Sequence, residues 1–472
     1  MSLATMGIDA YQLTTLVAHA DAGRLDHQVS MSFFFRRMPA HRNFVVFAGL
    51  RQVLEHAAQM GFDEGDLALF DNHPIVGAAL QSRPALRAAL RQMKGFVGEI
   101  DAVPEGTLVY ADAARDATGA PVQIAGAPLR IYTPMIQVRT DMLRAKLIET
   151  PWLGYINYLC MVASKAARVV LAANGKPVLE FGTRRAHPAA AVDAAYAAYI
   201  AGASASSNMA ATRKWGVPSV GTMDHFAIQA AEQIGRPPTE TEGEFFAAFA
   251  QAFPASSTLL VDTYDTERGI ESAVSATKGR LSGIRIDSNV TPATIERARG
   301  ILRSMNAADA KVFVSDGLDE HKVAALADLA DGFGVGENIT CSPDSPTGVG
   351  AVAKLVVNGY GKVTMKFAKG SGKATLPGEL QVHRFPDHDL VALSSEVAPP
   401  GGKPLLQPVW RGDKPVGRLP TLDETRSLVR EQLAQLPADV RSLQQHDRPR
   451  SLVASDGLIQ EVKRLVEEAR LT

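Results

Sequence analysis

The sequence predicts an α/β protein: a parallel sheet with crossover helices, open or closed into a barrel, and a second, β-rich domain. Two observations support this fold class. From about residue 178 to 336, short apolar runs alternate with Ala-rich helical stretches, which is typical of parallel strands joined by right-handed crossovers. The flanking regions, up to about residue 130 and from 350 to 412, contain several extended segments.

The apolar runs predict the strands of the parallel sheet. They read PVLEFG, PSVGT, TLLVDTY, GIRID, KVFVSD and GFGVG. Helical stretches such as AAAVDAAYAAYIAG, TPATIERARGILRSM and DEHKVAALADLAD follow most of them. In parallel sheets of this kind, catalytic residues gather at the carboxyl ends of the strands.

The flanking segments predict a second domain into which the barrel is inserted. FFFRRMP and NFVVFAGLRQVLEHAAQMGF predict a strand and then a helix, and GAVAKLVVNGYGKVTMKF predicts extended chain. The prediction therefore has four parts: an N-terminal mixed α/β domain at 1–130, a barrel at 131–350, a β-rich segment completing the first domain at 351–420, and C-terminal helices at 421–472.

Composition and charge are those of an ordinary globular protein. The 472 residues are 46% hydrophobic, and the net charge of −1 offers no bulk attraction to nucleic acid or to an anionic membrane. Cys160 and Cys341 lie far apart in the chain, which fits a reducing cytosol and argues against a cysteine-based zinc site. The longest apolar segment contains Lys165 and Arg168, which predicts a buried helix and not a membrane span. We expect a cytoplasmic protein with neither nucleic acid nor membrane as a partner.

Polar residues or glycines follow strand after strand in the alternating region. A series of strands that all end in this way predicts an active site at one end of the sheet. The residues are Arg184 and Arg185 after LEFG, His225 after SVGT, Asp262 and Asp265 in VDTYD, Asp287 after IRI, Asp316 after VFVS, and Gly334 and Gly336 in FGVG.

Each motif also has a simpler explanation. The glycines of GFGVGEN suit a phosphate cradle or a tight turn. The carboxylates of LLVDTYDT and GIRIDSN suit Mg²⁺ held with substrate phosphates, or they cap helices, as Asp265 would. Arg36 and Arg37 suit a diphosphate or a solvated surface. His225 taken alone is more often a cap or a core residue. The chain lacks G-x-S-x-G, H-E-x-x-H, Walker and G-x-G-x-x-G motifs, so hydrolase triads, kinase-like folds and dehydrogenases are disfavoured.

Together the motifs resemble those of the nicotinate phosphoribosyltransferase family. DAYQLT resembles the family's D-L-Y-Q-L-T, FFRRMPAHRNFVVFAGL resembles F-F-R-x-x-P with a run ending in A-G-L, and EFGTRRA resembles F-G-x-R-R-A. AYIAGASASSNMAATRKWGVPSVGTMDH is similar to a block with Y-x-x-G, T-S-N, G-I-P and G-T-x-x-H. LVDTYDT, IRIDS, SDGLDE, FGVG and KATLPG then follow in the family's order and spacing.

The resemblance implies a type II phosphoribosyltransferase: an irregular (β/α) barrel with a mixed, β-rich second domain, usually in a homodimer with shared active sites. It implies that nicotinate and phosphoribosyl pyrophosphate react to give nicotinate mononucleotide and pyrophosphate, a step of NAD biosynthesis by salvage. It also implies ATP as co-substrate, coupled through a phosphohistidine, and Mg²⁺ as cofactor, with no metal ligand identified.

The family's site residues carry over to matching positions of this chain. His225 matches the histidine that ATP phosphorylates, and Arg285 and Asp287 match an arginine and the acid that binds the ribose. Basic residues, an aromatic plate and an acid on the sugar suit a cation-like transition state. The other matches are Tyr11 on the pyridine ring, Arg184, Arg185, Ser207 and Asp224 around the base and the histidine, and Arg36, Arg37, Gly334, Gly336, Lys354 and Lys373 around phosphates.

The choice of base and the level of activity leave alternatives open. A nicotinamide-using relative has an aspartate where this chain has Ser207, and a neutral residue beside arginines favours the carboxylate of nicotinate. Three motifs depart from the family: D-S-G-D becomes DSNV with Asn289 and Val290, G-V-G-T becomes GVGEN with Glu337, and Phe226 replaces a serine. The alternatives are therefore nicotinamide or another pyridine base as substrate, or a catalytically reduced paralogue that binds nucleotide.

Overall fold

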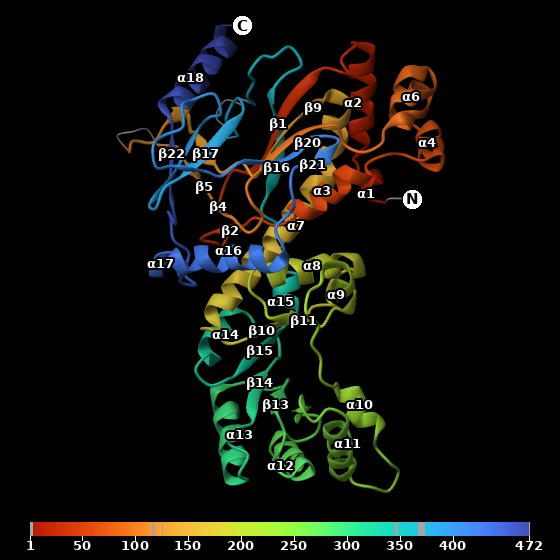
Figure 1. The fold of residues 1–472 in the computed structure, drawn as a ribbon, viewed down its shortest axis with the longest axis vertical. Coiled ribbons are helices and arrows are strands. Elements are labelled where there is room, and N and C mark those ends of the chain that lie inside the picture. The colour runs from red at the N-terminus through yellow and green to blue at the C-terminus, as the bar shows by residue number, and fades with distance from the viewer. Residues whose placement is uncertain (1–2, 116–118, 125, 345–347, 367–372, 472) are drawn as a thin grey trace. The chain divides into compact units, whose positions relative to one another are not determined.

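The computed structural model describes residues 3–115, 119–124, 126–344, 348–366 and 373–471 (Figure 1). The chain divides into two compact units. Unit 1 contains Met1–Met161, Thr347–Val440 and Gln444–Thr472, and unit 2 contains Val162–Pro346 and Arg441–Leu443. Unit 2 is therefore inserted into the chain of unit 1.

Unit 2 is built on a six-stranded parallel sheet with the order β11-β10-β15-β14-β13-β12. Strand residues such as Leu259, Ile284, Val312 and Phe333 are fully buried, as is typical of parallel sheets. The curled sheet forms an incomplete barrel and confirms the predicted fold class. The strands are β10 (Val178–Glu180), β11 (Ala205–Ser206), β12 (Thr258–Leu260), β13 (Gly283–Ile286), β14 (Lys311–Val314) and β15 (Gly332–Val335).

One predicted strand, PSVGT, is wrong. In the structure this segment forms only an isolated bridge, between Ser219 and Ser206 of β11. Pro218 has no backbone N–H, so it cannot donate to a regular ladder of hydrogen bonds. The segment continues without regular structure to Asp224, where helix α10 begins.

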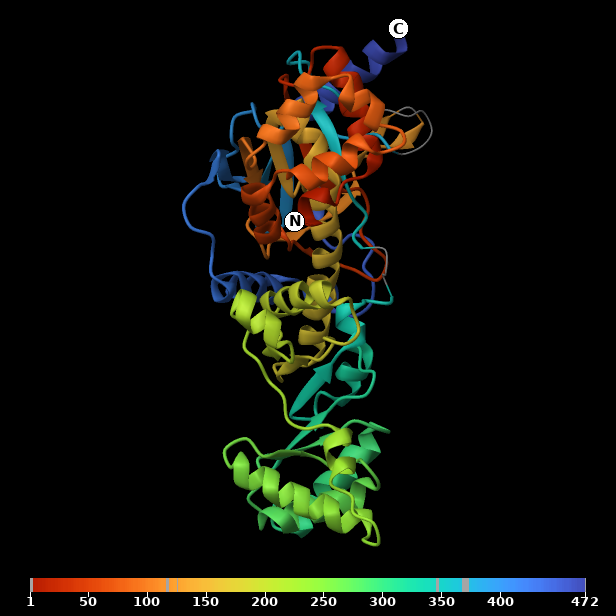
Figure 2. The same cartoon turned by 90° about the vertical axis from the view of Figure 1, so that its right-hand side faces the viewer.

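Side-chain caps set the start of most helices that follow these strands. Asp224 accepts a hydrogen bond from the backbone N–H of Ala227, and Asp265 accepts one from Arg268, which confirms the capping role considered for Asp265. Helices α11 and α12 pack side by side (Figures 1 and 2). The helices are α8 (Pro188–Ile200), α9 (Met209–Trp215), α10 (His225–Ala230), α11 (Pro238–Ala252), α12 (Thr266–Thr277), α13 (Pro292–Ser304), α14 (Glu320–Leu326) and α15 (Glu337–Thr340).

Unit 1 contains two larger sheets: the first pairs early with late segments of the chain, and the second is built from late segments alone. The first has the order β16-β1-β9-β3-β20-β21, and the second has the order β19-β17-β18-β22. Late strand β16 pairs with β1, and β20 pairs with β3, which confirms that later chain completes the N-terminal domain. The strands are β1 (Gln28–Phe35), β3 (Gly98–Ala102), β9 (Ile136–Asp141), β16 (Ala351–Val357), β17 (Leu380–Arg384), β18 (His388–Leu393), β19 (Lys403–Pro404), β20 (Gln407–Gly412), β21 (Lys414–Pro415) and β22 (Ser451–Ala454).

The helices of unit 1 come from both ends of the chain. Buried helix side chains pack with aromatic residues of the sheet: the ring centroid of Phe33 in β1 lies 5.6 Å from that of Trp152, in the long helix Met142–Ala172. The helices include α2 (Ala10–Asp21), α3 (Leu50–Gln59), α4 (Glu64–Asp71), α5 (Gly77–Gln81), α6 (Pro84–Gln92), α16 (Leu422–Gln435) and α18 (Asp456–Leu471).

Helix α7 (Met142–Ala172) connects the two units. The first segment of unit 1 ends within this helix at Met161, and unit 2 begins at Val162. These unit boundaries differ from the predicted divisions after residues 130 and 350. The difference arises because β9 pairs with β1 and β3, which holds residues 136–141 in unit 1. Within the described ranges, no helix combines the length and the apolar character needed to cross a membrane.

Candidate active site

The carboxylate of Asp287 is held at the carboxyl end of β13 by the loops after two neighbouring strands. The hydroxyl of Ser315, after β14, donates a hydrogen bond of 2.5 Å to Asp287 Oδ1. The backbone N–H of Asp287 donates one of 2.8 Å to Asp262 Oδ2, after β12. Because three adjacent parallel strands end at the same edge, their loops meet here, as the strand-end pattern predicts.

His225 lies beside this carboxylate. As the first residue of α10 it follows the cap residue Asp224, and its Nδ1 lies 3.1 Å from Thr263 Oγ1. Its Nε2 lies 3.9 Å from Asp287 Oδ2. The side chain is about one third exposed, so solvent or a ligand can reach the ring. The hydrogen-bond partner of the ring is therefore Thr263, while Asp224 uses Oδ1 to cap the helix.

Arg285 holds the segment that leads into His225. Its guanidinium donates hydrogen bonds of 3.2 Å to Thr222 Oγ1 and 3.1 Å to the carbonyl oxygen of Met223. Burial lowers the pKa of Arg285 from its ordinary value, and the nearby Arg184 acts in the same direction, whereas Asp287 opposes both. Arg285 stays charged at neutral pH, and its charge is surrounded by the carboxylates of Asp287, Asp262 and Asp224 as well as by Arg184.

A carboxylate oxygen of Asp262 is buried without a hydrogen-bond partner in the described part of the chain. Such an oxygen suits a cation or a substrate hydroxyl. Within the same described ranges, no three His, Cys, Asp or Glu side chains are grouped closely enough to hold a metal ion by themselves. A divalent ion at Asp262 and Asp287 would need additional ligands from substrate phosphates, which is the usual situation of Mg²⁺.

The loops after β10 and β11 bring the residues predicted for the base together. The hydroxyls of Thr183 and Ser207 lie 3.1 Å apart, and Arg184 follows Thr183 directly. Arg185 points its guanidinium to Glu337, with 3.7 Å between the charged atoms. Both side chains of that pair are more than half exposed, so the attraction is weak, but the negative charge of Glu337 has a neighbouring cation.

Gly334 and Gly336 are required by close packing around Phe181. A Cβ on Gly334 would lie 2.5 Å from the Phe181 ring, and a Cβ on Gly336 would lie 3.0 Å from the Phe181 carbonyl oxygen. Gly336 is also the residue before α15. These contacts explain on steric grounds why glycine occupies both positions. The contact of the two glycines with a phosphate remains a prediction.

The conformation of Asn289 bears on one of the departures from the family motif. Asn289 has φ of 51°, in the left-handed region that glycine adopts most readily. Asparagine is among the few other residues that tolerate this region. The DSNV sequence therefore keeps a backbone conformation that the family's glycine would favour.

In unit 1, the predicted residues Tyr11, Arg36 and Lys354 share one charged neighbourhood. Lys146 Nζ lies 5.1 Å from the centroid of the Tyr11 ring. Burial raises the pKa of the Tyr11 hydroxyl, and Glu149 adds to this. Burial lowers the pKa of Lys354, Glu149 opposes this, and Arg36 and Lys146 lower the pKa further. An aromatic ring and several cations are thus gathered in this unit.

Arg37 and Lys373, the other two cations predicted in unit 1, are both exposed. Arg37 lies close enough to Arg130 to lower its pKa, although burial is the larger cause. Clustered guanidinium groups of this kind suit a phosphate ligand. Lys373 follows the undescribed residues 367–372 and precedes the buried Thr375.

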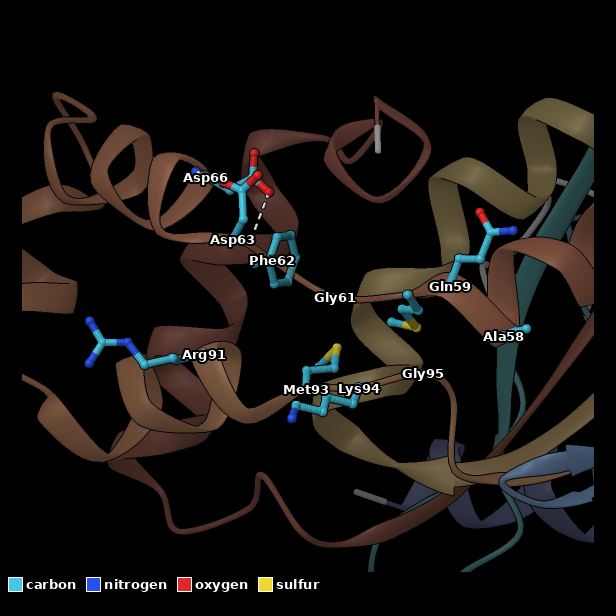
Figure 3. Close-up of a pocket in the computed structure, with 11 residues that line it drawn as sticks. Ala58, Gln59, Gly61, Phe62, Asp63, Asp66, Arg91, Met93, Lys94 and Gly95 are labelled. Carbon is cyan, nitrogen blue, oxygen red and sulfur yellow. Dashed lines mark hydrogen bonds between the residues drawn. The ribbon is translucent and has the colours of Figure 1, made fainter. Parts of the chain in front are cut away.

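A cavity of about 490 Å³ in unit 1 lies apart from every predicted site residue (Figure 3). It is lined by residues 58–63, Asp66, Arg91 and 93–95. Asp63 and Asp66 are engaged in the reciprocal cap of α4, and Arg91 pairs with Glu64 at 2.7 Å. Asp63, Asp66 and Arg91 are therefore already engaged, and we assign no role to the cavity.

Sequence reasoning missed four polar residues that hold the predicted ones in place: Glu180, Thr222, Thr263 and Ser315. Thr263 and Ser315 adjoin strand-end acids in the sequence, so their position was a usable signal. Glu180 ends β10 and is 1% exposed, and a carboxylate inside the apolar run VLEF was the signal there.

Comparison with known proteins relates both units to phosphoribosyltransferases. Residues 6–114 match the family model of the nicotinate phosphoribosyltransferase N-terminal domain, and residues 162–344 match that of the quinolinate phosphoribosyl transferase C-terminal domain. A solved structure of human nicotinic acid phosphoribosyltransferase has a TM-score of 0.80 at 24% identity, covering 97% of this chain and 99% of that one. Nicotinate-nucleotide pyrophosphorylase of Pyrococcus furiosus has a TM-score of 0.70 at 24% identity, covering 92% and 96%. At these identities, the two structures support the fold alone.

Sequence identity to characterised relatives extends over nearly the whole chain. The chain is 34% identical to the nicotinate phosphoribosyltransferase pncB2 of Mycobacterium tuberculosis, covering 97% of this chain and 93% of that protein. It is 32% identical to the nicotinate phosphoribosyltransferase of Bacillus subtilis, covering 80% and 72%. The chain therefore belongs to the nicotinate phosphoribosyltransferase family.

Proposed function

We propose that this protein is a nicotinate phosphoribosyltransferase of cytoplasmic NAD salvage. It would join nicotinate to phosphoribosyl pyrophosphate, giving nicotinate mononucleotide and pyrophosphate, with coupled hydrolysis of ATP. The observation that carries the proposal is the position of His225 between Thr263 and Asp287 at the strand ends, in a chain 34% identical to relatives named for this activity.

The chemistry at the sugar assigns a role to Asp287. The bond from the anomeric carbon to the diphosphate breaks as the bond to the pyridine nitrogen forms, and the sugar gains positive charge between them. A carboxylate near the ribose hydroxyls stabilises that charge and fixes the sugar in line. The hydrogen bonds from Ser315 and to Asp262 support this assignment, because they prevent the Asp287 side chain and backbone from turning away.

Nicotinate is the proposed base because an arginine and neutral hydroxyls flank the part of the site assigned to its substituent. Arg184 lies near Arg285, and the neighbouring hydroxyls of Thr183 and Ser207 are neutral. A carboxylate ligand is favoured there over a neutral amide. Tyr11 would stack on the pyridine ring, contributed by the second subunit of a homodimer.

His225 is the proposed acceptor of the ATP γ-phosphoryl group. With its proton on Nδ1, shared with Thr263 Oγ1, the ring has a lone pair on Nε2 for the phosphorus. The Nε2–P bond forms as the bond between the γ-phosphorus and the bridging oxygen breaks, and ADP leaves with that oxygen. Mg²⁺, held by Asp262 and Asp287 with substrate phosphates, would neutralise phosphate charge.

The test combines purified protein with nicotinate, phosphoribosyl pyrophosphate and ATP labelled at the γ-phosphate. We expect nicotinate mononucleotide and an acid-labile label on the wild type. His225→Ala should lose the label and the stimulation by ATP but keep slow transfer, because the histidine does not attack the sugar. His321→Ala, at an exposed position on α14, is the matched control.

Three outcomes would contradict parts of this proposal. Product with nicotinamide only would overturn the choice of base. Tight nucleotide binding without pyrophosphate release would indicate the reduced paralogue, although the left-handed conformation of Asn289 does not favour it. A persistent label on His225→Ala would overturn the phosphohistidine. For the homodimer, mixing Tyr11→Ala with Asp287→Asn should restore part of the activity if the subunits share sites.

A further inference from the structure

A single buried carboxylate connects three segments at the carboxyl ends of β10, β11 and β15. Glu180 is 1% exposed. Its Oε2 accepts a hydrogen bond of 2.6 Å from Ser206 Oγ, the last residue of β11. Its Oε1 accepts one of 2.9 Å from Thr340 Oγ1 at the end of α15, and another from the backbone N–H of Gly182. The three donors belong to three separate segments of the chain and meet at this carboxylate.

Each segment held by Glu180 carries residues of the proposed site. Gly182 precedes Thr183 and Arg184, which face the base in the proposed function. Ser206 Oγ also accepts a hydrogen bond of 3.0 Å from the backbone N–H of Asn208, which fixes the turn that presents Ser207. Thr340 ends the short helix that begins after Gly336, at the predicted phosphate loop.

The contacts of Glu180 leave little room for another arrangement. A Cβ on Gly182 would lie 2.7 Å from Glu180 Oε1 and would overlap the Thr340 side chain. Burial raises the pKa of the Glu180 carboxyl, and its three hydrogen bonds oppose this. In the described part of the chain all three donors are neutral groups, so the carboxylate is held by hydrogen bonds and not by a cation.

We propose that Glu180 is a positioning residue that sets the base subsite through Ser206 and the phosphate subsite through Thr340. The inference rests on the function proposed above and assigns a specific task to a residue outside the predicted site. The effects of the two hydroxyl donors should therefore be separable. The Ser206 hydroxyl affects the affinity for nicotinate, and the Thr340 hydroxyl affects the affinity for phosphoribosyl pyrophosphate.

The test removes one of the two hydroxyl donors to Glu180 at a time. Ser206→Ala removes two buried hydrogen bonds, to Glu180 and from Asn208, and should raise the KM for nicotinate about tenfold or more. It should leave the KM for phosphoribosyl pyrophosphate within about twofold. Thr340→Val should raise the KM for phosphoribosyl pyrophosphate and leave the KM for nicotinate nearly unchanged. Thr277→Val is the matched control: among the described residues, that buried hydroxyl bonds to carbonyl oxygens of its own helix α12, and neither KM should change.

Two substitutions of Glu180 itself complete the design. Glu180→Gln keeps an acceptor for Gly182 and Thr340, and its amide can donate to Ser206, so both KM values should stay near those of the wild type. Glu180→Ala should raise both KM values and should speed hydrogen exchange in residues 182–187, 206–208 and 337–340. If Glu180→Ala does not fold, the two hydroxyl variants still decide the question.

The outcomes separate this inference from the proposed function. If the wild type makes no mononucleotide, the function is wrong, and the hydrogen-exchange pattern of Ser206→Ala and Thr340→Val still tests the linkage. Faster exchange confined to each variant's own segment and its Glu180 contacts supports the inference. Equal changes in both KM values for each hydroxyl variant, or no change in KM and exchange for either, would overturn it.

Discussion

Lys165 Nζ lies 2.5 Å from Glu320 Oε2, and neither side chain is more than 3% exposed. Arg168 Nε donates a hydrogen bond of 3.0 Å to the other oxygen of Glu320, and Lys165 also lies 3.0 Å from Asp344 Oδ1. Burial alone would raise the pKa of Glu320, but the two cations outweigh it and lower the pKa. The end of α7 is thereby tied to the start of α14 inside unit 2.

Replacing Lys165 by Met should destabilise the protein strongly. Removal of one partner from a buried ion pair leaves an uncompensated charge, which lowers the free energy of unfolding by about 3–5 kcal/mol. Urea denaturation of the full chain measures the change. Lys362→Met is the control, because its pair with Glu468 is largely exposed and is worth at most about 1 kcal/mol. Equal losses for the two variants would refute the structural role of the buried pair.

Asp287→Asn should lower kcat/KM about 100-fold or more, the usual effect of removing one group that stabilises transition-state charge. Ser315→Ala should have a smaller effect, because it removes only the hydrogen bond that holds the carboxylate. Steady-state kinetics with both substrates measures this. Asp319→Asn, which alters the cap of α14 after the adjacent strand, is the control and should keep kcat/KM. An Asp287→Asn enzyme with unchanged kcat/KM would exclude the assigned role.

Glu242 should make the stability of the protein depend on pH. It is 1% exposed on α11, and burial, together with Asp262 and Asp265, raises its pKa from 4.5 to about 7. The folded protein then binds this proton more tightly than the unfolded chain. The free energy of unfolding should therefore fall as pH rises from about 4.5 to about 7.

The check is the difference between the wild type and Glu242→Gln in urea denaturation at several pH values. The variant should be the more stable protein at pH 8, by about 1–2 kcal/mol, and this advantage should shrink toward pH 5. Glu240→Gln, at an exposed position on the same helix, should show no such trend. A pH-independent difference for Glu242→Gln would contradict the raised pKa.

Asn289 should tolerate glycine better than alanine. Its φ of 51° is unfavourable for a side chain with an ordinary Cβ by about 1 kcal/mol, whereas glycine adopts it freely. We expect Asn289→Gly to keep stability and activity and Asn289→Ala to lose about 1 kcal/mol of unfolding free energy. Thermal denaturation and initial rates measure both. A more active Asn289→Gly would mean that the DSNV departure weakens catalysis.

Tyr11→Ala should raise the KM for nicotinate, and Tyr11→Phe should leave it nearly unchanged, because the proposed contact uses the ring face and not the hydroxyl. Loss of one aromatic stacking contact is worth about 0.5–1.5 kcal/mol, or a few-fold in KM. Steady-state kinetics at varied nicotinate measures this. If Tyr11→Phe is as impaired as Tyr11→Ala, the hydroxyl and its neighbour Glu149 carry the role instead.

Much of the fold could be predicted from the sequence because local patterns encode it. Apolar runs followed by polar residues mark the strands of unit 2, and Asp224 and Asp265 begin helices where the sequence puts an acid after a strand. The predicted site residues of unit 2 follow from the same rule, since parallel strands bring their carboxyl ends to one edge. Two segments broke the pattern: PSVGT forms no regular strand, because Pro218 cannot donate a hydrogen bond to a neighbouring strand, and the edge strand β11 was not predicted.

The sequence by itself therefore determined the fold class, the strand ends and the residues available for chemistry. The tertiary structure alone decided which partners those residues have: Thr263 for His225, Ser315 for Asp287, and three neutral donors for the buried Glu180. The physical reason is the separation along the chain over which each interaction acts. Periodicity and capping act between neighbours in the chain, whereas a buried carboxylate takes its donors from whichever segments the packed sheet brings to it.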